Sequence, residues 1–213
     1  MFIDLSKLQS NLAGIGMLTT VGLSSNVYVI GLKSLTLVDS GVGNRANLLA
    51  PQFERTDLRL KDVHQVVLTH VHHDHTGGLR EVHDHSTPTV FVQEADAVYL
   101  RVPKLVRLKG GEEIITELGS LSVLHTPGHS AGSLCLYDPR RQVLFSGDTA
   151  FPDGGFGRTD GDSGSSLDMI NSLKKLAQLK VQVLLPGHGE PVTEGAEQSL
   201  SLSLHEAEEY FRD

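Results

Sequence analysis

Short runs of apolar residues recur along the whole chain, and turn-forming Gly, Asp, Asn, Ser and Pro residues separate them. Runs of four or five residues that are rich in Val, Leu and Ile and are bounded in this way are typical of buried β-strands. The pattern predicts strands at residues 26–30, 35–39, 65–69, 89–92, 121–125, 133–137, 142–146 and 181–185.

Helical periodicity lies between and after these runs. Residues 166–179 place Leu167, Ile170 and Leu173 on one helical face and Lys174 on the opposite face, as in a helix that packs on a core. Further helices are expected at 191–211 and, on weaker patterns, at 44–50, 77–85 and 94–99. Strands throughout the chain with helices among them predict a layered α/β fold.

No linker rich in Pro, Gly or Ser is long enough to divide the chain, so we expect a single domain over residues 1–213. The glycine-rich stretch 153–165 is interpreted as one long surface loop. The apolar pattern alone leaves the topology of the sheets open.

Composition narrows the classes of function. The formal net charge of −8 argues against a nucleic-acid binder and against attachment to anionic membranes, because both need a basic surface. No apolar run reaches membrane-spanning length. The single cysteine, Cys135, excludes an intrachain disulfide, and the N-terminus lacks the basic-then-apolar order of a secretory signal. A cytoplasmic protein is therefore expected, either a monomer or a homodimer.

A cluster of histidines directly follows the strand expected at residues 65–69. It contains His70, His72, Asp74 and His75, and a Gly-Gly pair comes shortly after it. Alternate side chains of an extended segment point the same way, so His70 and His72 can bind one metal ion. The turn would then direct Asp74 and His75 toward a second position. Imidazole and carboxylate donors without a thiolate suit zinc, manganese and iron.

Three further candidate ligands share one kind of setting. His129, Asp148 and His188 each follow a predicted strand within a few residues, and each has glycine beside it. Functional residues concentrate on loops of this kind because a rigid scaffold positions them. The repeated arrangement favours a common metal site over three unrelated loop residues.

With these motifs, the chain resembles the metallo-β-lactamase fold superfamily. The resemblance rests on the H-x-H-x-D-H motif of residues 70–75, on His129, Asp148 and His188 in the same order, and on Asp39 in a Val-Asp-Ser-Gly segment. It covers most of the chain. It implies a four-layer αβ/βα sandwich with the metal site at the edge between two mixed β-sheets.

The resemblance also implies roles for individual residues. One metal ion would be held by His70, His72 and His129, a second by Asp74, His75 and His188, and Asp148 would bridge the two. Asp39 would lie beside the site and orient a ligating imidazole. The expected cofactors are two divalent metal ions, with zinc favoured and iron or manganese as alternatives.

Such a site favours hydrolysis. Two carboxylates leave a positive surplus on two divalent cations, and a metal-bound water can reach a pKa of about 7. We therefore expect a metal-bridging hydroxide to attack the carbonyl carbon of a small-molecule substrate. Asp74 is the expected catalytic residue, because its carboxylate can orient the hydroxide.

The loop Gly157-Arg158-Thr159-Asp160 resembles the glyoxalase II-like branch, which implies hydrolysis of a thioester of the hydroxyacylglutathione type. Arg158, Thr159 and Asp160 are candidate substrate contacts, with an ion pair or turn that braces the loop as the alternative. Full-length glyoxalase II adds a C-terminal helical domain with basic residues that bind glutathione. Here residues 194–213 contain only Arg212 as a cation, so a thioester of another thiol is equally allowed.

Two other activities stay open on these motifs. A persulfide dioxygenase of the same superfamily would use a single iron at the counterparts of His70 or His72, His129 and Asp148. A lactone hydrolase would use the same pair of metals. The uninterrupted set of seven ligands favours the thioester hydrolase.

Overall fold

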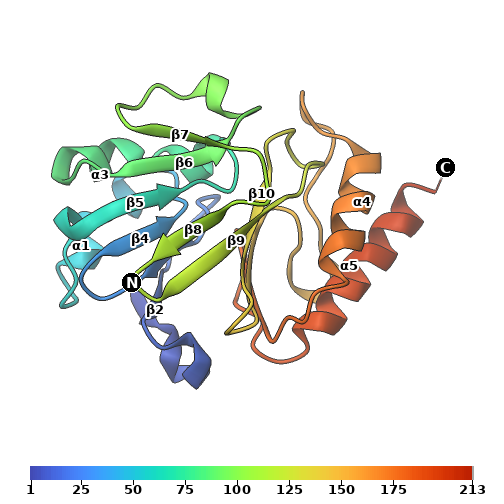
Figure 1. The fold of residues 1–213 in the computed structure, drawn as a ribbon, viewed down its shortest axis with the longest axis horizontal. Helices are drawn as coiled ribbons and strands as arrows, with labels where there is room; N and C mark the ends of the chain where they lie inside the picture. The colour runs from blue at the N-terminus through green and yellow to red at the C-terminus, as the bar shows by residue number, and fades with distance from the viewer. Residues whose placement is uncertain (213) are drawn as a thin grey trace.

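Two β-sheets face each other across the middle of the molecule in the computed structural model, which describes residues 1–212 (Figure 1). The larger sheet has the strand order β1-β2-β3-β4-β5-β6-β7. Its strands are β1 (Phe2–Asp4), β2 (Ile15–Leu18), β3 (Val27–Ile30), β4 (Leu35–Val38), β5 (Val63–Val67), β6 (Thr89–Gln93) and β7 (Leu105–Leu108). Neighbouring strands are antiparallel from β1 to β4 and parallel from β4 to β7.

The smaller sheet has the strand order β12-β11-β10-β9-β8. Its strands are β8 (Glu113–Thr116), β9 (Gly119–His125), β10 (Leu134–Asp138), β11 (Val143–Gly147) and β12 (Val183–Pro186). Strands β11 and β12 are parallel and the other pairs are antiparallel. Both sheets are therefore mixed, as expected.

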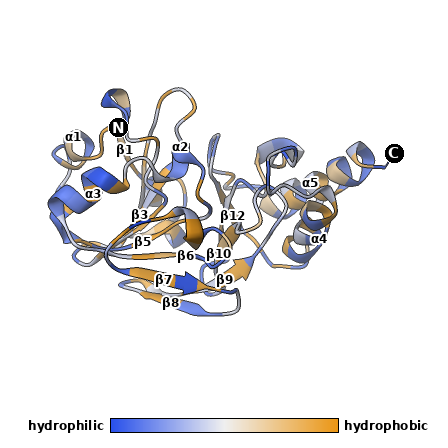
Figure 2. Cartoon of the chain, turned by 90° about the horizontal axis from the view of Figure 1, so that it is seen from above, coloured by the Kyte–Doolittle hydropathy of each residue, from blue (hydrophilic) through white to orange (hydrophobic). Residues whose placement is uncertain are grey.

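Helices cover the outer face of each sheet. Figure 2 shows α1 and α3 on one side of the strands and α4 and α5 on the other side. The α-helices are α1 (Ala50–Phe53), α2 (His73–Thr76), α3 (Leu79–His85), α4 (Ser166–Leu176) and α5 (Ala196–Tyr210). Single 3₁₀ turns are η1 (Leu5–Lys7), η2 (Ser10–Leu12), η3 (Arg45–Asn47), η4 (Leu60–Asp62), η5 (Ala97–Tyr99) and η6 (Pro152–Gly154).

Buried apolar side chains form three layers between these elements. The central layer joins the two sheets, with Ile30 and Val67 from the larger sheet against Leu136 and Phe145 from the smaller one. A second layer lies between the larger sheet and its helices, and a third lies between the smaller sheet and α4 and α5. The predicted four-layer αβ/βα sandwich is therefore confirmed.

All eight strands expected from the sequence are present within a few residues, and so are the helices at 166–179 and 191–211. Four strands were not expected: β1, β2, β7 and β8. β1, β7 and β8 are edge strands with few buried positions, whereas β2 is buried throughout but is short and contains Gly16. Exposed polar residues such as Arg107 in β7 and Glu113 in β8 interrupt the apolar pattern there.

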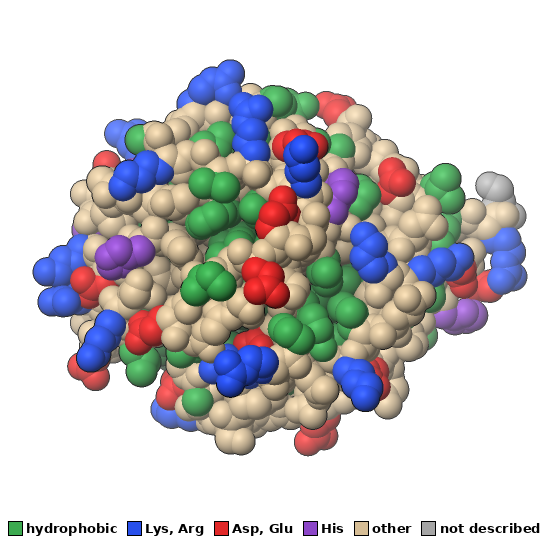
Figure 3. Space-filling model, viewed as in Figure 1, with side chains coloured by type: hydrophobic (Ala, Val, Ile, Leu, Met, Phe, Trp, Pro, Cys, Tyr) green, Lys and Arg blue, Asp and Glu red, His purple; other side chains and the backbone are tan. Residues whose placement is uncertain are grey.

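The exterior carries charges of both signs. On the face drawn in Figure 3, basic and acidic side chains are interspersed, and hydrophobic side chains form small groups between them. Among residues 1–212, no helix combines the length and the apolar character needed to cross a bilayer.

Candidate metal centre

Loops from both sheets meet at one edge of the sandwich. The segment after β5 carries His70, His72, Asp74 and His75, the last two on the short helix α2. The loop between β9 and β10 carries His129, the residue after β11 is Asp148, and His188 follows β12. The structure thus brings together all seven residues that the sequence singles out.

The first group of donors consists of His70, His72 and His129. Nδ1 of His72 lies 3.0 Å from Nε2 of His70 and 2.8 Å from Nε2 of His129. Two imidazole nitrogens at such a distance hydrogen-bond only when one of them carries a proton. Alternatively, all three lone pairs can point to one cation between them.

The second group consists of Asp74, His75 and His188. Oδ2 of Asp74 lies 3.1 Å from Nε2 of His188 and 3.6 Å from Nε2 of His75. His75 is fully buried, whereas the other two side chains are partly exposed toward the adjacent pocket.

Asp148 lies between the two groups and faces members of both. Its Oδ1 is 3.3 Å from Nε2 of His75, and its Oδ2 is 3.6 Å from Nε2 of His129 and 3.5 Å from Nε2 of His188. A carboxylate in this position can donate one oxygen to each of two cations.

The donor set fits two divalent cations. Nε2 of His75 and Oδ1 of Asp148 are buried and have no hydrogen-bond partner within residues 1–212. Buried polar atoms rarely remain unpaired, so such a pair requires an explanation. The seven residues form three overlapping groups of three, and within each group the donor atoms lie within 4.8 Å of one another. Cations with nitrogen and oxygen ligands would satisfy the two unpaired atoms.

Asp39 holds His75 from the side opposite the donor cluster. Its Oδ2 lies 2.8 Å from Nδ1 of His75, and its two oxygens also accept hydrogen bonds from the N–H and O–H groups of Thr69. The backbone of Asp39 has a φ of 61°, an uncommon value for a residue other than glycine. This position matches the orienting role expected for Asp39, because Nε2 of His75 is left free to face the donors.

Two other imidazoles are held through Nδ1. Nδ1 of His129 lies 2.9 Å from the carbonyl oxygen of Arg158, and Nδ1 of His70 lies 3.2 Å from Oγ1 of Thr69. Metal-binding histidines commonly use the second ring nitrogen in this way. No local pattern in the sequence indicates the contact to the Arg158 carbonyl, because it depends on the path of the glycine-rich loop.

Opposing effects set the protonation of the cluster. Burial opposes charge on His75, but the carboxylates of Asp39 and Asp148 raise its pKa to about 10. Asp148 and Asp74 raise the pKa of His188 to about 9. Burial and the neighbouring His75 hold the pKa of His70 well below its usual value. Burial acts against ionisation of Asp148, yet the adjacent His188 and His75 hold its pKa well below the usual range.

A pocket of about 670 Å³ opens over the donor cluster. Its volume lies within the range of small-molecule sites. Beyond five of the seven predicted residues, its lining consists of Leu23, Val42, His73, Arg158 and Gly161. Leu23 is 88% exposed, which is high for a leucine. In the sequence, only the turn-forming Gly22 before it suggests that this side chain lies on an exposed loop. His73, which lies among the ligands in the sequence, belongs to none of the donor groups but borders the pocket.

The expected substrate loop lies at the rim of this pocket. Arg158 lines it, and Nε of Arg158 forms an exposed ion pair with Oδ1 of Asp160 at 2.7 Å. Thr159 Oγ1 lies 3.0 Å from Oγ of Ser166, the first residue of α4. Asp160 and Thr159 therefore brace the loop in this structure, and their contact with a substrate stays a prediction.

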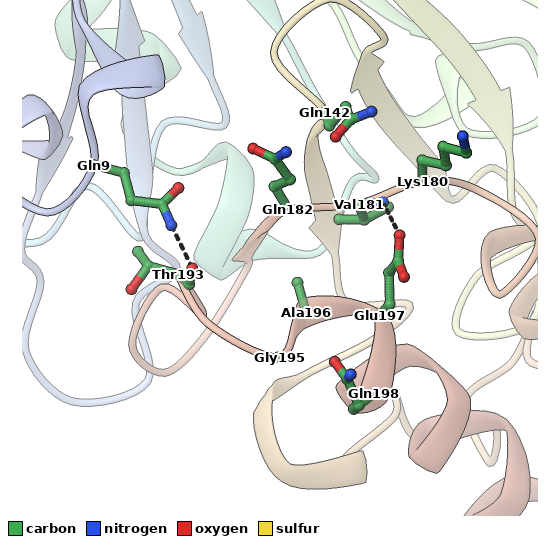
Figure 4. Close-up of a pocket in the computed structure, with 10 residues that line it drawn as sticks. All are labelled: Gln9, Gln142, Lys180, Val181, Gln182, Thr193, Gly195, Ala196, Glu197 and Gln198. Atoms are coloured by element: carbon green, nitrogen blue, oxygen red, sulfur yellow. Dashed lines mark hydrogen bonds between the residues drawn. The ribbon is translucent and has the colours of Figure 1, made fainter.

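A different pocket, of about 340 Å³, lies where α5 begins (Figure 4). Backbone and amide groups line much of it, and the Val181 N–H donates to Oε1 of Glu197 there. None of the seven donor residues borders it. The candidate site is therefore the pocket over the histidine cluster.

Residues 20–188 match the description of the metallo-beta-lactamase superfamily, and the chain belongs to this superfamily. It is 29% identical over 190 residues to the probable metallo-hydrolase MJ0888 of Methanocaldococcus jannaschii, with 79% of this chain and 89% of that protein covered. It is 34% identical over 173 residues to the hydroxyacylglutathione hydrolase of Bartonella tribocorum, with 78% of this chain covered.

The match to the Bartonella enzyme spans 66% of that enzyme's own length. Among solved structures, the protein TTHA1623 in a di-iron-bound form is similar at a TM-score of 0.68 and 28% identity, with 87% of this chain and 95% of that chain covered. These similarities agree with the resemblance to the glyoxalase II-like branch.

Proposed function

We propose that this protein is a dinuclear metal-dependent hydrolase whose substrate is a small acyl thioester. The observation that carries the proposal is the pair of donor groups that meet at Asp148, with buried atoms of His75 and Asp148 left unpaired. A single-cation site would need only one of these groups. We also propose that the chain acts as one domain, because its central layer combines strands from both ends of the sequence.

All seven donor residues would bind the cations, and Asp74 would have a second role in catalysis. His70, His72 and His129 would hold one cation, Asp74, His75 and His188 the other, and Asp148 both. Bound there, two divalent cations would lower the pKa of a water molecule and polarise a substrate carbonyl. Zinc is the favoured cation, with iron and manganese as alternatives.

Asp74 is the residue proposed to act on the attacking water. Burial acts against its ionisation, but the hydrogen bond to His188 lowers its pKa, so its carboxylate is ionised at neutral pH. The carboxylate borders the pocket and can accept a hydrogen bond from water there, which fixes the direction of the oxygen lone pair toward the carbonyl carbon.

The thioester substrate is supported by the similarity to a hydroxyacylglutathione hydrolase and by the chemistry of the pocket rim. Leu23 and Val42 offer apolar contact to an acyl chain or to the thiol portion. Arg158 offers one cation to a carboxylate on the substrate. A cytoplasmic location and the choice between monomer and homodimer stay predictions.

The proposal is tested first by elemental mass spectrometry of protein purified without added metal, followed by a panel of acyl thioesters and lactones. Two ions per chain and thioester turnover are expected. One iron per chain with oxygen consumption would instead identify the persulfide dioxygenase alternative. Absence of metal, with none taken up on reconstitution, would contradict the proposal.

Two matched histidine variants connect metal content to the site. His129→Ala should lose about one ion per chain and most turnover. His205→Ala removes an exposed histidine of α5 that belongs to none of the donor groups and should keep both. Equal loss in the two variants would point to general destabilisation rather than to the proposed ligand.

A further inference from the structure

Asp96 is a buried carboxylate that lies outside the set of candidate ligands. It follows β6 and is only 2% exposed. Its Oδ2 accepts hydrogen bonds from the Val71 N–H and from the Ser130 hydroxyl, each at 3.2 Å. Among the described residues, no Lys or Arg forms an ion pair with Asp96 within 4.0 Å.

The two donors to Asp96 belong to two different ligand loops. Val71 lies between His70 and His72, and Ser130 directly follows His129. One carboxylate oxygen therefore joins the loop that leaves the larger sheet to the loop that leads into the smaller sheet. The three imidazoles of the first donor group lie on these two loops.

Gly132 shows how closely the second loop packs against this carboxylate. A Cβ atom at Gly132 would lie 2.3 Å from Cγ of Asp96 and 2.4 Å from its Oδ1. Only glycine leaves room for such an approach. Ser130 is held in turn by Ser133, whose hydroxyl lies 2.9 Å from that of Ser130.

A carboxylate at this buried position does not increase the stability of the fold. Burial raises the pKa of Asp96 above its usual value even though hydrogen bonds from Ser130 and Val71 oppose the shift. A buried charge without a cationic partner is costly, and an apolar or neutral side chain would often be tolerated as well. The arrangement provides one fixed acceptor for two donors on two loops.

We propose that Asp96 is a positioning residue for the first cation, because it sets the spacing between the His70–His72 segment and His129. It touches neither substrate nor cation. The inference rests on the proposed metal site but not on the identity of the substrate.

The second half of the site has a separate brace. The Asn26 amide donates to the carbonyl oxygens of Pro186 and Gly189, and the Tyr28 hydroxyl donates to Pro186 at 2.7 Å. These contacts flank the segment that carries His188. Because the two braces share no residue, loss of Asp96 should loosen one half of the site and leave the other half in place.

The first experiment measures binding of Zn²⁺ to metal-stripped protein by competition with a chromophoric chelator. Asp96→Asn keeps the size of the side chain but removes the negative charge that strengthens both hydrogen bonds to the two loops. We expect the affinity for one of the two zinc ions to fall about 10- to 100-fold, as is usual when partners of ligand loops are removed.

Asp138→Asn is the matched control. Asp138 is also buried and also accepts backbone N–H groups, from Arg140 and Arg141, but it lies at the far end of β10 from the His129 loop. Its variant should bind both zinc ions as the wild type does, whatever its melting temperature. A loss of zinc affinity in Asp96→Asn no greater than in Asp138→Asn would overturn the proposal.

Two variants that each lack one ligand show which half of the metal site depends on Asp96. In His188→Ala, which retains the first donor group, adding Asp96→Asn should still weaken the remaining zinc ion about 10-fold or more. In His129→Ala, which retains the second group, Asp96→Asn should change zinc binding less than about threefold. Equal weakening in both backgrounds would make Asp96 a general structural residue and contradict the inference.

Gly132→Ala is the second variant in case Asp96→Asn fails to fold. Its new Cβ displaces the same carboxylate from the other side, so the same selective loss of one zinc ion is expected. Failure to bind zinc in the wild type would contradict the proposed function itself. Normal binding of two ions by the wild type and by both variants would contradict only the role of Asp96.

Discussion

Oδ2 of Asp39 lies 2.8 Å from Nδ1 of His75, and both side chains are buried. The same carboxylate accepts the N–H and O–H groups of Thr69, which precedes the histidine cluster. One side chain from the end of β4 thus fixes both the start of the cluster and the ring orientation of its most buried member. As a result, Nε2 of His75 points at Asp148.

Asp39→Asn tests this relationship without changing the backbone requirement, since Asn tolerates a positive φ better than most residues. The amide has one acceptor oxygen for three donors. We expect the zinc affinity of the half that contains His75 to fall about 10- to 100-fold, measured by chelator competition. Retention of full affinity for both ions would show that the Asp39–His75 contact is dispensable.

The pKa shifts in the cluster predict opposite trends with pH for the cation-free protein and for zinc binding. Without cations, His75 and His188 have pKa values of about 10 and about 9, above the ordinary value of 6.5. Their contribution to stability is therefore complete below pH 6.5 and is lost as the pH rises through 9 to 10.

Zinc must displace the same protons, so its affinity should increase over that window. Melting temperatures of the metal-stripped protein and zinc titrations at a series of pH values check both trends. In His188→Gln, the part of each trend near pH 9 should disappear. Zinc affinity that does not change between pH 6.5 and 9 would contradict the assigned proton states.

Gly187 allows the two cation groups to come close together. A Cβ at this position would lie 2.2 Å from Oδ1 of Asp148 and 2.9 Å from Cε1 of His75. Gly187→Ala should therefore weaken zinc binding by about tenfold or more, in line with other changes beside metal ligands. Gly161→Ala, at a loop glycine with no atom within 4 Å of its added Cβ, is the control and should bind zinc normally.

Phe145 joins the two sheets through its contact with Tyr28, with ring centroids 5.4 Å apart. Truncation of a buried phenylalanine costs about 3–5 kcal/mol, so Phe145→Ala should lower the free energy of unfolding of the metal-stripped protein by that amount. Urea denaturation measures it. Ile115→Ala removes a side chain that is 67% exposed on β8, and it should change stability by less than about 0.5 kcal/mol.

Arg158 has a main-chain role and a side-chain role that one variant can separate. Its carbonyl holds His129, whereas its guanidinium lies at the rim of the pocket. Arg158→Gln should keep two zinc ions and the kcat for a neutral thioester. The KM for a thioester that carries a carboxylate should rise about two- to fivefold, the loss of one exposed charge contact. Equal KM changes for both substrates would assign the side chain to loop bracing alone.

Much of this architecture could be predicted from the sequence because buried strands and ligand loops have strong local patterns. His70, His72, Asp74 and His75 follow an uninterrupted apolar run, and the structure brings them together with the later candidates. Edge strands such as β7 and β8 were missed, since their exposed positions dilute the apolar pattern.

The supporting residues were harder to predict. Asp96 is one of many acidic residues, and its partners Val71 and Ser130 become its neighbours only when two sheets are stacked. Leu23 resembles any loop leucine until the pocket beneath it is known. Contacts between distant segments have no periodicity along the chain, so local reasoning does not detect them.

Each donor group draws residues from both sheets: the histidine cluster after β5 belongs to the larger sheet, whereas His129, Asp148 and His188 belong to the smaller one. Bound cations would therefore link the two sheets reversibly at the open edge of the sandwich. Their loss would leave this edge held by hydrogen bonds such as those of Asp96 and Asn26, so its loops would open more often and be cleaved faster by proteases. The survival time of the folded chain would then depend on the supply of free metal around it.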